Sequence, residues 1–172
     1  MRIDLENCVL RSWRPEDAPA LARAANNRNV WLGLRDLMPH PYTLEDAQAY
    51  LRQVESKRPE ISFCIEVQGE AAGAIGLRMG EDVHRETAEL GYWLAEPHWG
   101  RGIASEAVRV FVQYGFEAMP LQRIFALVHA NNAASVRVLE KAGFVFEGRM
   151  RRNVIKDGQT LDSLLYARVR DP

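Results

Sequence analysis

The stretch Glu89–Glu106 constrains the fold most, because it combines a strand, a glycine turn and a helix start. Glu89–Leu94 is short, apolar and rich in aromatic residues, as strands are, and Glu96-Pro97 ends it. We expect a helix to open at Ser105-Glu106. The first turn of a helix has unpaired N–H groups and a positive dipole end, and glycines let the backbone approach a phosphate closely. The stretch therefore predicts a pyrophosphate site made by Trp99, Gly100, Arg101, Gly102, Ile103, Ala104 and Ser105.

Two common phosphate-binding turns do not match this stretch. A P-loop closes on Gly-Lys-Ser/Thr, and the dinucleotide fingerprint needs a third glycine, whereas this turn closes on Ile103-Ala104-Ser105. The turn instead resembles that of the GNAT acetyltransferase superfamily, Gln/Arg-x-x-Gly-x-Gly/Ala. Gly102-Ile103-Ala104 supplies the Gly-x-Ala, while Trp99 stands where Gln or Arg is common. Together with the preceding ELGYWL, the turn is most similar to the RimJ/RimL branch, the ribosomal-protein N-acetyltransferase type.

A second motif, later in the chain, also resembles this family. Asn132-Ala133-Ala134-Ser135 is similar to its Asn-x-x-Ser helix start, and Ala142-Gly143-Phe144 follows at the family's spacing. The resemblance implies that Asn132 contacts the pantetheine arm of acetyl-CoA, the co-substrate, and that Ser135 lies near the thiol. Asn132 is also placed to cap the helix, and one side chain can do both. We expect one GNAT domain over residues 1–172.

The order of predicted elements agrees with that family. It is β-α-α-β-β-β-α-β-α-β-β, which indicates an α/β (α+β) fold. The resemblance implies a mixed, mostly antiparallel central sheet of about seven strands with helices on both faces. It also implies a splayed parallel pair made by Glu89–Leu94 and Arg123–His129.

Composition excludes several other classes of protein. The chain has 172 residues, 47% of them hydrophobic, and a net charge of −1, so it carries no electrostatic signature of nucleic-acid or membrane binding. The polar N-terminus and the lack of a long apolar run predict a cytoplasmic protein. Cys8 and Cys64 fit reduced core thiols, and the four histidines show no metal-ligand spacing, so we expect no metal.

Acetyl transfer to an amine needs a base, donors for the carbonyl oxygen and an acid for the leaving sulfur. Glu89 is the candidate base, acting through water, although a solvated carboxylate at a strand start is the alternative. The resemblance places the oxyanion donor and the pantetheine contacts near the backbone of Trp93 and Leu94. Many family members have a tyrosine acid where this chain has Leu139, so Ser135 is the candidate replacement. A first-turn serine more often bonds its own helix backbone.

The acceptor pocket is expected between the two N-terminal helices and the last hairpin, with the irregular stretch from Trp31 to Tyr42 lining it. Trp31, Asp36 and Tyr42 are the candidate substrate-binding residues, with packing beneath the loop as the alternative. We expect the acceptor to be one of four amines: a ribosomal protein N-terminus, an amino acid, a polyamine or an antibiotic. A non-catalytic acyl-CoA-sensing module is the rival reading, since it would keep the turn without needing Glu89. A homodimer is plausible for the family, but the sequence shows no interface signature.

Overall fold

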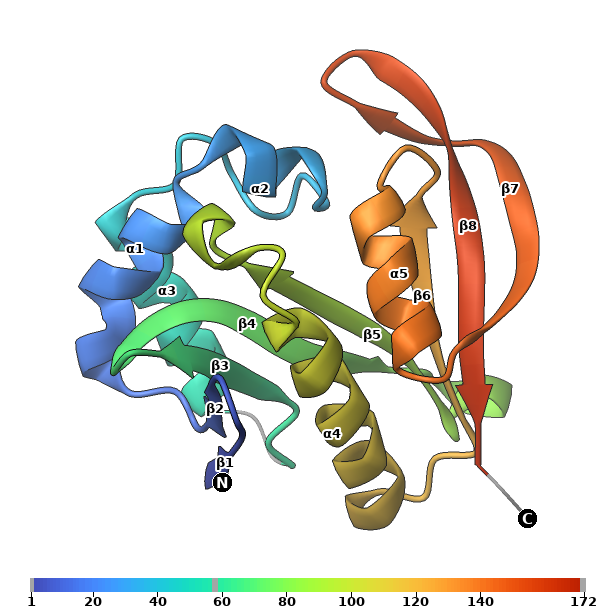
Figure 1. Cartoon of the computed structure of the whole chain (residues 1–172), viewed down its shortest axis with the longest axis horizontal. Coiled ribbons are helices and arrows are strands. Elements are labelled where there is room, and N and C mark those ends of the chain that lie inside the picture. Colours follow the sequence, from blue (N-terminus) through green and yellow to red (C-terminus); the bar gives the residue numbers. More distant parts are fainter. Residues whose placement is uncertain (1, 57–58, 171–172) are drawn as a thin grey trace. The chain divides into compact units, whose positions relative to one another are not determined.

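The chain forms a mixed α/β structure around one open sheet (Figure 1). This computed structural model describes residues 2–56 and 59–170. Eight strands follow the order β1-β2-β3-β4-β5-β6-β8-β7. Within it β5 and β6 run parallel, whereas β1–β2, β2–β3, β3–β4, β6–β8 and β7–β8 are antiparallel. The predicted fold class is confirmed.

The elements have the following bounds. The strands are β1 (Arg2–Asp4), β2 (Val9–Arg11), β3 (Ser62–Val67), β4 (Glu70–Met79), β5 (Thr87–Leu94), β6 (Arg123–His129), β7 (Val145–Lys156) and β8 (Gln159–Val169). The helices are α1 (Ala18–Ala25), α2 (Arg28–Leu32), α3 (Leu44–Glu55), α4 (Ile103–Ala118) and α5 (Ala133–Lys141). Three short 3-10 helices are η1 (Pro15–Asp17), η2 (Asp82–His84) and η3 (Glu96–His98).

The chain divides into two compact units. Unit 1 is Met1–Gly76 with Tyr92–Ala107, and unit 2 is Leu77–Gly91 with Val108–Pro172. Strands β4 and β5 and helix α4 each contribute residues to both units.

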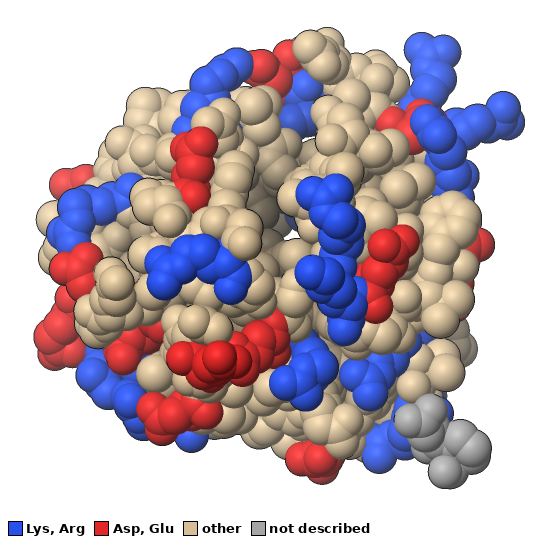
Figure 2. All heavy atoms as spheres, viewed as in Figure 1, with Lys and Arg blue, Asp and Glu red and all other residues tan. Residues whose placement is uncertain are grey.

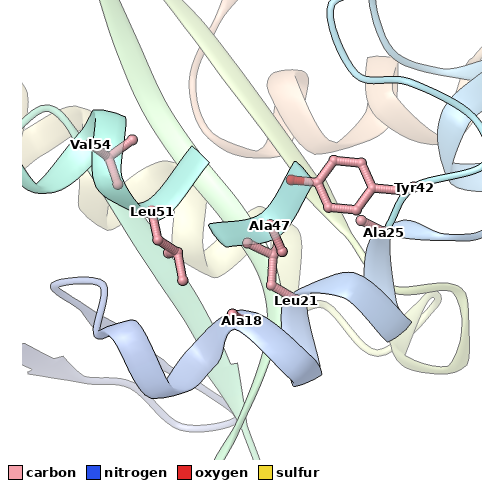
Figure 3. Packing of buried hydrophobic residues seen from close by; sticks show 7 residues of the cluster. All are labelled: Ala18, Leu21, Ala25, Tyr42, Ala47, Leu51 and Val54. Carbon is pink, nitrogen blue, oxygen red and sulfur yellow. The ribbon is translucent and has the colours of Figure 1, made fainter. Parts of the chain in front are cut away.

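In unit 1 a cluster of small and branched side chains holds α1 against α3 (Figure 3). Leu21 of α1 and Leu51 of α3 are buried in it, and Trp13 and Trp93 pack against its edge. Helix α3 begins at Thr43, which forms the predicted capping box with Asp46. Its predicted end near Lys57 lies outside the described residues. Burial of one amphipathic face of each helix is what stabilises such short helices.

A buried ion network fastens the start of unit 1. The guanidinium of Arg11, only 3% exposed, donates to both carboxylate oxygens of Asp17 at 2.7 Å and also to Glu66. Such bidentate, charge-assisted bonds compensate for the desolvation of buried charges. The network joins β2 to η1 and β3. Cys8 and Cys64 lie in the same unit as buried, free thiols, as predicted.

Unit 2 contains the rest of α4 and the C-terminal strands. Ile124 of β6 pairs with Arg168 of β8, so both side chains lie on one face of the sheet. Gly115 of α4 packs against Ile124, and Arg168 donates to the carbonyl of Ala142 at the end of α5. Helices α4 and α5 therefore cover the same face of the unit 2 sheet.

Several boundaries differ from those predicted. The sheet has an eighth strand, β1, because Arg2–Asp4 pairs with β2, and Arg28–Leu32 forms a helix where only a break was expected. Strand β7 runs past the expected end at Met150 to Lys156, and its pairing with β8 resumes at Val154 after a register irregularity that follows Met150. Helix α4 begins at Ile103, two residues before the predicted start.

Both signs of charge occur on the face of the molecule drawn in Figure 2, and neither covers it. No helix within residues 2–56 and 59–170 is long and apolar enough to cross a membrane.

Candidate active site

The turn before α4 has the backbone form that only glycine adopts easily. Gly100 and Gly102 have φ values of +73° and +80°, and a Cβ at either position would meet nothing within 4 Å. Conformation, and not space, therefore requires glycine at both positions. Gly102 immediately precedes α4 and has no side chain to cap it. The first-turn N–H groups, on Ile103, Ala104 and Ser105, therefore receive no bond from a side chain at position 102, and N–H groups at a helix start are suited to an anion.

Trp99 fixes this turn to the strand that precedes it. Its indole N–H donates to the carbonyl oxygen of Leu94 at 2.7 Å, which spans η3. The exposed guanidinium of Arg101 contacts the ring nitrogen of His98 at 3.3 Å. Both side chains stand in or beside the turn, and their contact with the co-substrate stays a prediction. The tryptophan at the usual Gln/Arg position thus has a structural task, closing the turn onto the end of β5.

The end of β5 also lies unusually close to β4 within unit 1. A Cβ on Gly73 would lie 2.3 Å from the carbonyl oxygen of Trp93, so no side chain fits there. Ala95 continues the pairing, donating its N–H to the carbonyl of Ala72 at 2.7 Å. This close approach fixes the backbone of Trp93 and Leu94, the residues predicted to face the co-substrate.

Glu89 is buried in unit 2 and paired with Arg78. In the β4–β5 hairpin Gly80 donates its N–H to the carbonyl of Thr87, a register that places Arg78 directly across from Glu89. Arg78 donates a hydrogen bond to the Glu89 carboxylate, whose side chain is 11% exposed. The solvated carboxylate weighed as an alternative is therefore not what the structure has. Arg78 was missed by sequence reasoning, although pairing of opposite charges across a hairpin was a usable signal.

Glu89 also marks the end of the parallel pairing. The register joins Thr87 to Arg123, Ala88 to Ile124 and Glu89 to Phe125. Strand β6 nevertheless continues to His129. Parallel strands that stop pairing while they continue leave backbone groups for another partner.

Asn132 and Ser135 open helix α5. The Asn132 side-chain oxygen accepts a hydrogen bond from the Ser135 N–H at 3.0 Å, so the capping interpretation is confirmed. The Nδ2 group of Asn132 makes no hydrogen bond within the described part of the chain, and it keeps two donors for a ligand. Leu139 is fully buried in α5 and can donate no proton.

The predicted acceptor residues lie in or just after α2. Trp31 stacks on His40, with ring centroids 5.6 Å apart, and Arg28 lies over the same indole at 5.8 Å. Asp36 is exposed in the following loop. Tyr42, in contrast, is 7% exposed within the α1–α3 cluster, where burial raises its pKa to about 12. It thus supports the loop from below and offers little surface to a ligand.

Each unit brings some of these residues together. Unit 1 holds the glycine turn, Trp93, Leu94 and the acceptor segment, while unit 2 holds Glu89, Asn132 and Ser135. The profile of the acetyltransferase (GNAT) domain matches residues 7–145, which spans parts of both units. The chain belongs to the GNAT acetyltransferase family. It is an acetyl-CoA-dependent acetyltransferase.

Individual GNAT relatives agree over nearly the full length. The chain is 33% identical to the uncharacterized N-acetyltransferase YoaA of Bacillus subtilis, over 98% of this chain and 96% of that one. It is 28% identical to spermidine N(1)-acetyltransferase of Escherichia coli, over 87% and 79% of the two chains. A solved structure of RimL, the ribosomal L7/L12 alpha-N-protein acetyltransferase in complex with coenzyme A, superimposes with a TM-score of 0.86. It is 23% identical and covers 98% of each chain, so it shows a shared fold.

The residues of this GNAT chain fit coenzyme A. The anion-ready start of α4 suits a pyrophosphate, and the spare amide of Asn132 suits the amides of pantetheine. Within residues 2–56 and 59–170, no group of three or more His, Cys, Asp or Glu side chains could hold a metal ion.

A further contact in unit 1 was not foreseen from the sequence. Glu96, interpreted only as a strand terminator, accepts hydrogen bonds from the side chains of Asn27 and Asn29. The run Asn26-Asn27-Arg28-Asn29 was interpreted only as a helix breaker. Three asparagines within four residues were the available signal, because asparagine side chains commonly fix local backbone by hydrogen bonds.

Proposed function

We propose that this GNAT domain transfers the acetyl group of acetyl-CoA to a primary amine, which attacks directly in a ternary complex. The observation that carries the proposal is the start of α4. There two glycines with positive φ leave uncapped N–H groups, in a chain whose family is established. When bound, acetyl-CoA supplies an acetyl group activated as a thioester. We infer that the turn from Trp99 to Ser105 binds its pyrophosphate and that Asn132 Nδ2 donates to its pantetheine arm.

Glu89 is the proposed general base. An alkylammonium has a pKa of about 10.4 and an α-ammonium about 8, so the acceptor must lose a proton before it can attack. Glu89 would take that proton through a water molecule, and the hydrogen bond from Arg78 fixes the direction of its carboxylate. A carboxylate whose rotamer is held by a neighbour loses little entropy when it acts.

The remaining roles fall to backbone N–H groups and one hydroxyl. A backbone N–H of Trp93 or Leu94 would donate to the carbonyl oxygen as it gains charge, from a strand end held rigid by Gly73. Ser135, half-buried in the first turn of α5, would give a proton to the sulfur that leaves. Leu139 cannot share that task.

Two acceptor classes have support from relatives. One relative is named for spermidine, a polyamine, and one structural neighbour for the N-terminus of a ribosomal protein. We propose that the amine meets Asp36, whose exposed carboxylate attracts an ammonium group, beside Trp31, whose indole contacts His40 and Arg28. Amino acids and aminoglycoside antibiotics complete the set to test.

The test is thiol release from acetyl-CoA across peptides with a free α-amine, amino acids, polyamines and aminoglycosides. The wild-type chain should turn over one class. Glu89→Gln should lower kcat by about 100-fold on that class, since loss of general base catalysis typically costs that much or more. Its dissociation constant for coenzyme A should stay the same.

A matched control is Glu147→Gln. Glu147 is also a carboxylate bound to an arginine, Arg123, in unit 2, but it has no proposed chemical role. It should keep the wild-type kcat. If Glu89→Gln keeps full activity, another group is the base. If the wild type binds coenzyme A but acetylates no amine in the panel, the proposed acceptor chemistry is wrong.

A further inference from the structure

A carboxylate in unit 1 connects the segment before the glycine turn to the acceptor segment. Glu96 opens η3, three residues before Trp99. Its two oxygens accept hydrogen bonds from Asn27 Nδ2 at 2.7 Å and from Asn29 Nδ2 at 2.8 Å. These bonds join positions separated by 69 and 67 residues in the sequence. The contact is therefore tertiary, although each partner lies in a short local element.

Asn27 uses both ends of its amide at this contact. While Nδ2 donates to Glu96, Oδ1 accepts from the N–H groups of Asn29 and Val30, at 2.8 and 3.2 Å, and so caps α2. Rotating the amide to change one bond would lose the other. Glu96 thus holds the start of α2 in both position and orientation.

The far end of the same segment is also fixed. Asn26 Oδ1 accepts a hydrogen bond from the backbone N–H of Tyr42 at 3.1 Å, and Tyr42 is anchored in the α1–α3 cluster. Between these ends, Trp31 stacks on His40. The acceptor segment, Asn26–Tyr42, is therefore a closed loop whose start is bound to η3 through the carboxylate of Glu96.

The opposite side of η3 is joined to the turn that binds pyrophosphate in the proposed function. Trp99 donates to the carbonyl of Leu94 and so closes the chain around η3.

Hydrogen bonds from Asn27 and Asn29 hold the pKa of Glu96 below its usual value, and the carboxylate stays charged at neutral pH. Hydrogen bonds to a charged acceptor are stronger than those between neutral groups. They are therefore suited to holding the acceptor segment at a fixed distance from η3.

We propose that Glu96 is a positioning residue that sets the affinity for the amine by holding the acceptor segment in register with the glycine turn. This inference rests on the proposed function, because it takes Asn26–Tyr42 as the acceptor side. Glu96 touches neither reacting atom. Its loss should therefore weaken acceptor binding while the chemical step and the coenzyme A site remain.

The first experiment compares Glu96→Ala with a surface control, Glu70→Ala. Glu70 also contacts a helix of unit 1, through Arg23 at 3.1 Å, but does not touch the acceptor segment. Steady-state kinetics use the amine of the panel that the wild type turns over, such as spermidine or a short peptide with a free α-amine. Glu96→Ala should raise the acceptor KM about tenfold, the loss expected for a charged hydrogen-bonded contact. The kcat and the KM for acetyl-CoA should each stay within about twofold, and Glu70→Ala should match the wild type.

A polarity exchange separates positioning from general destabilisation. Asn29→Asp alone sets two carboxylates against each other, whereas Glu96→Gln alone is tolerated, because the Asn29 amide can turn over and offer Oδ1 to the new amide group. The double variant Glu96→Gln with Asn29→Asp restores a donor and an acceptor across the contact, while the remaining oxygen at position 96 still accepts from Asn27. Asn29→Asp should raise the acceptor KM and Glu96→Gln should leave it near the wild-type value. The double variant should return the KM of Asn29→Asp to within about threefold of the wild type.

Three outcomes would overturn the inference. The acceptor KM could stay at the wild-type value in Glu96→Ala, or the double variant could be no better than the worse single variant. Alternatively, kcat and both KM values could all deteriorate together with the melting temperature, which is the result of a merely structural role. The inference itself predicts that backbone hydrogen exchange in residues 28–32, which form α2, accelerates in Glu96→Ala, because the start of that helix loses its contact with η3. A wild-type chain that acetylates no amine of the panel would overturn the proposed function itself, and that result is visible before any variant is made.

Discussion

Helices α4 and α5 begin in opposite ways. At α5 the side chain of Asn132 folds back onto the N–H of Ser135, which is the ordinary way of satisfying a helix start. At α4 the preceding residue is Gly102, which has no side chain to offer. The first helix start is complete by itself, whereas the second one needs a partner from outside the helix. Water or an anionic ligand can satisfy such an uncapped start, so it is open to a ligand in a way that the capped start is not.

The largest effect should come from the uncapped start. Gly102→Ala forces a residue with a Cβ to adopt a φ of +80°, at a cost of about 1–2 kcal/mol, and the turn will relax away from its binding form. We expect affinity for coenzyme A to fall by about tenfold or more, measured by titration calorimetry.

Gly69→Ala is a closely matched control for that substitution. Gly69 has a φ of +84° in the two-residue β3–β4 turn, and its Cβ would also meet nothing within 4 Å. The strain should be the same, but coenzyme A binding should not change. Equal losses of affinity in both variants would show that the α4 start is not special.

The capped start should separate into two effects. Asn132→Ala removes the cap and should lower the free energy of unfolding by about 1 kcal/mol. Asn132→Asp keeps a capping oxygen but loses the Nδ2 donors, so the melting temperature should hold while the KM for acetyl-CoA rises several-fold. If Asn132→Asp leaves that KM unchanged, the side chain is a cap and nothing more.

The smallest effect on activity should come from a third start, that of α3. Thr43→Ala should cost about 1 kcal/mol of unfolding free energy and leave kcat and both KM values unchanged.

The same cap should make this effect depend on pH. Hydrogen bonds from the backbone N–H and the hydroxyl of Thr43 hold the pKa of Asp46 below its ordinary 3.8. A depressed carboxyl pKa stabilises the fold above that ordinary value, and the contribution is lost as the pH falls through the folded pKa. The difference in melting temperature between wild type and variant should therefore shrink below about pH 4, and a constant difference would mean that Asp46 takes no part.

Patterns of neighbouring residues in the sequence predicted the helix ends and turns well. The cap at Thr43, the αL glycine at Gly143 and the turn at Lys156–Gln159 all depend on neighbouring residues, so a pattern was enough to find them. Gly143 even completes the expected C-terminal motif, with Phe144 donating its N–H to the carbonyl of Leu139.

What sequence could not predict depends on distant pairing. Glu89 was found as a candidate, but its burial beside Arg78 follows from the hairpin register. The contact of Glu96 with Asn27 requires two segments far apart in the sequence to meet. Helix α4 begins two residues earlier than predicted. Gly102 has a positive φ and the next residue, Ile103, is already helical, and amino-acid composition does not specify such a direct transition.

The two buried thiols have a practical consequence for every assay named above. Burial raises the pKa of Cys8 to about 11 and that of Cys64 to about 12, so the folded chain presents almost no thiolate near neutral pH. A thiol-reactive dye added during turnover will therefore count released coenzyme A with little background from the enzyme. The same dye added in denaturant should gain two equivalents per chain, one for each of the 2 cysteines. One reagent can therefore measure both the release of coenzyme A during turnover and the exposure of the two cysteines on unfolding.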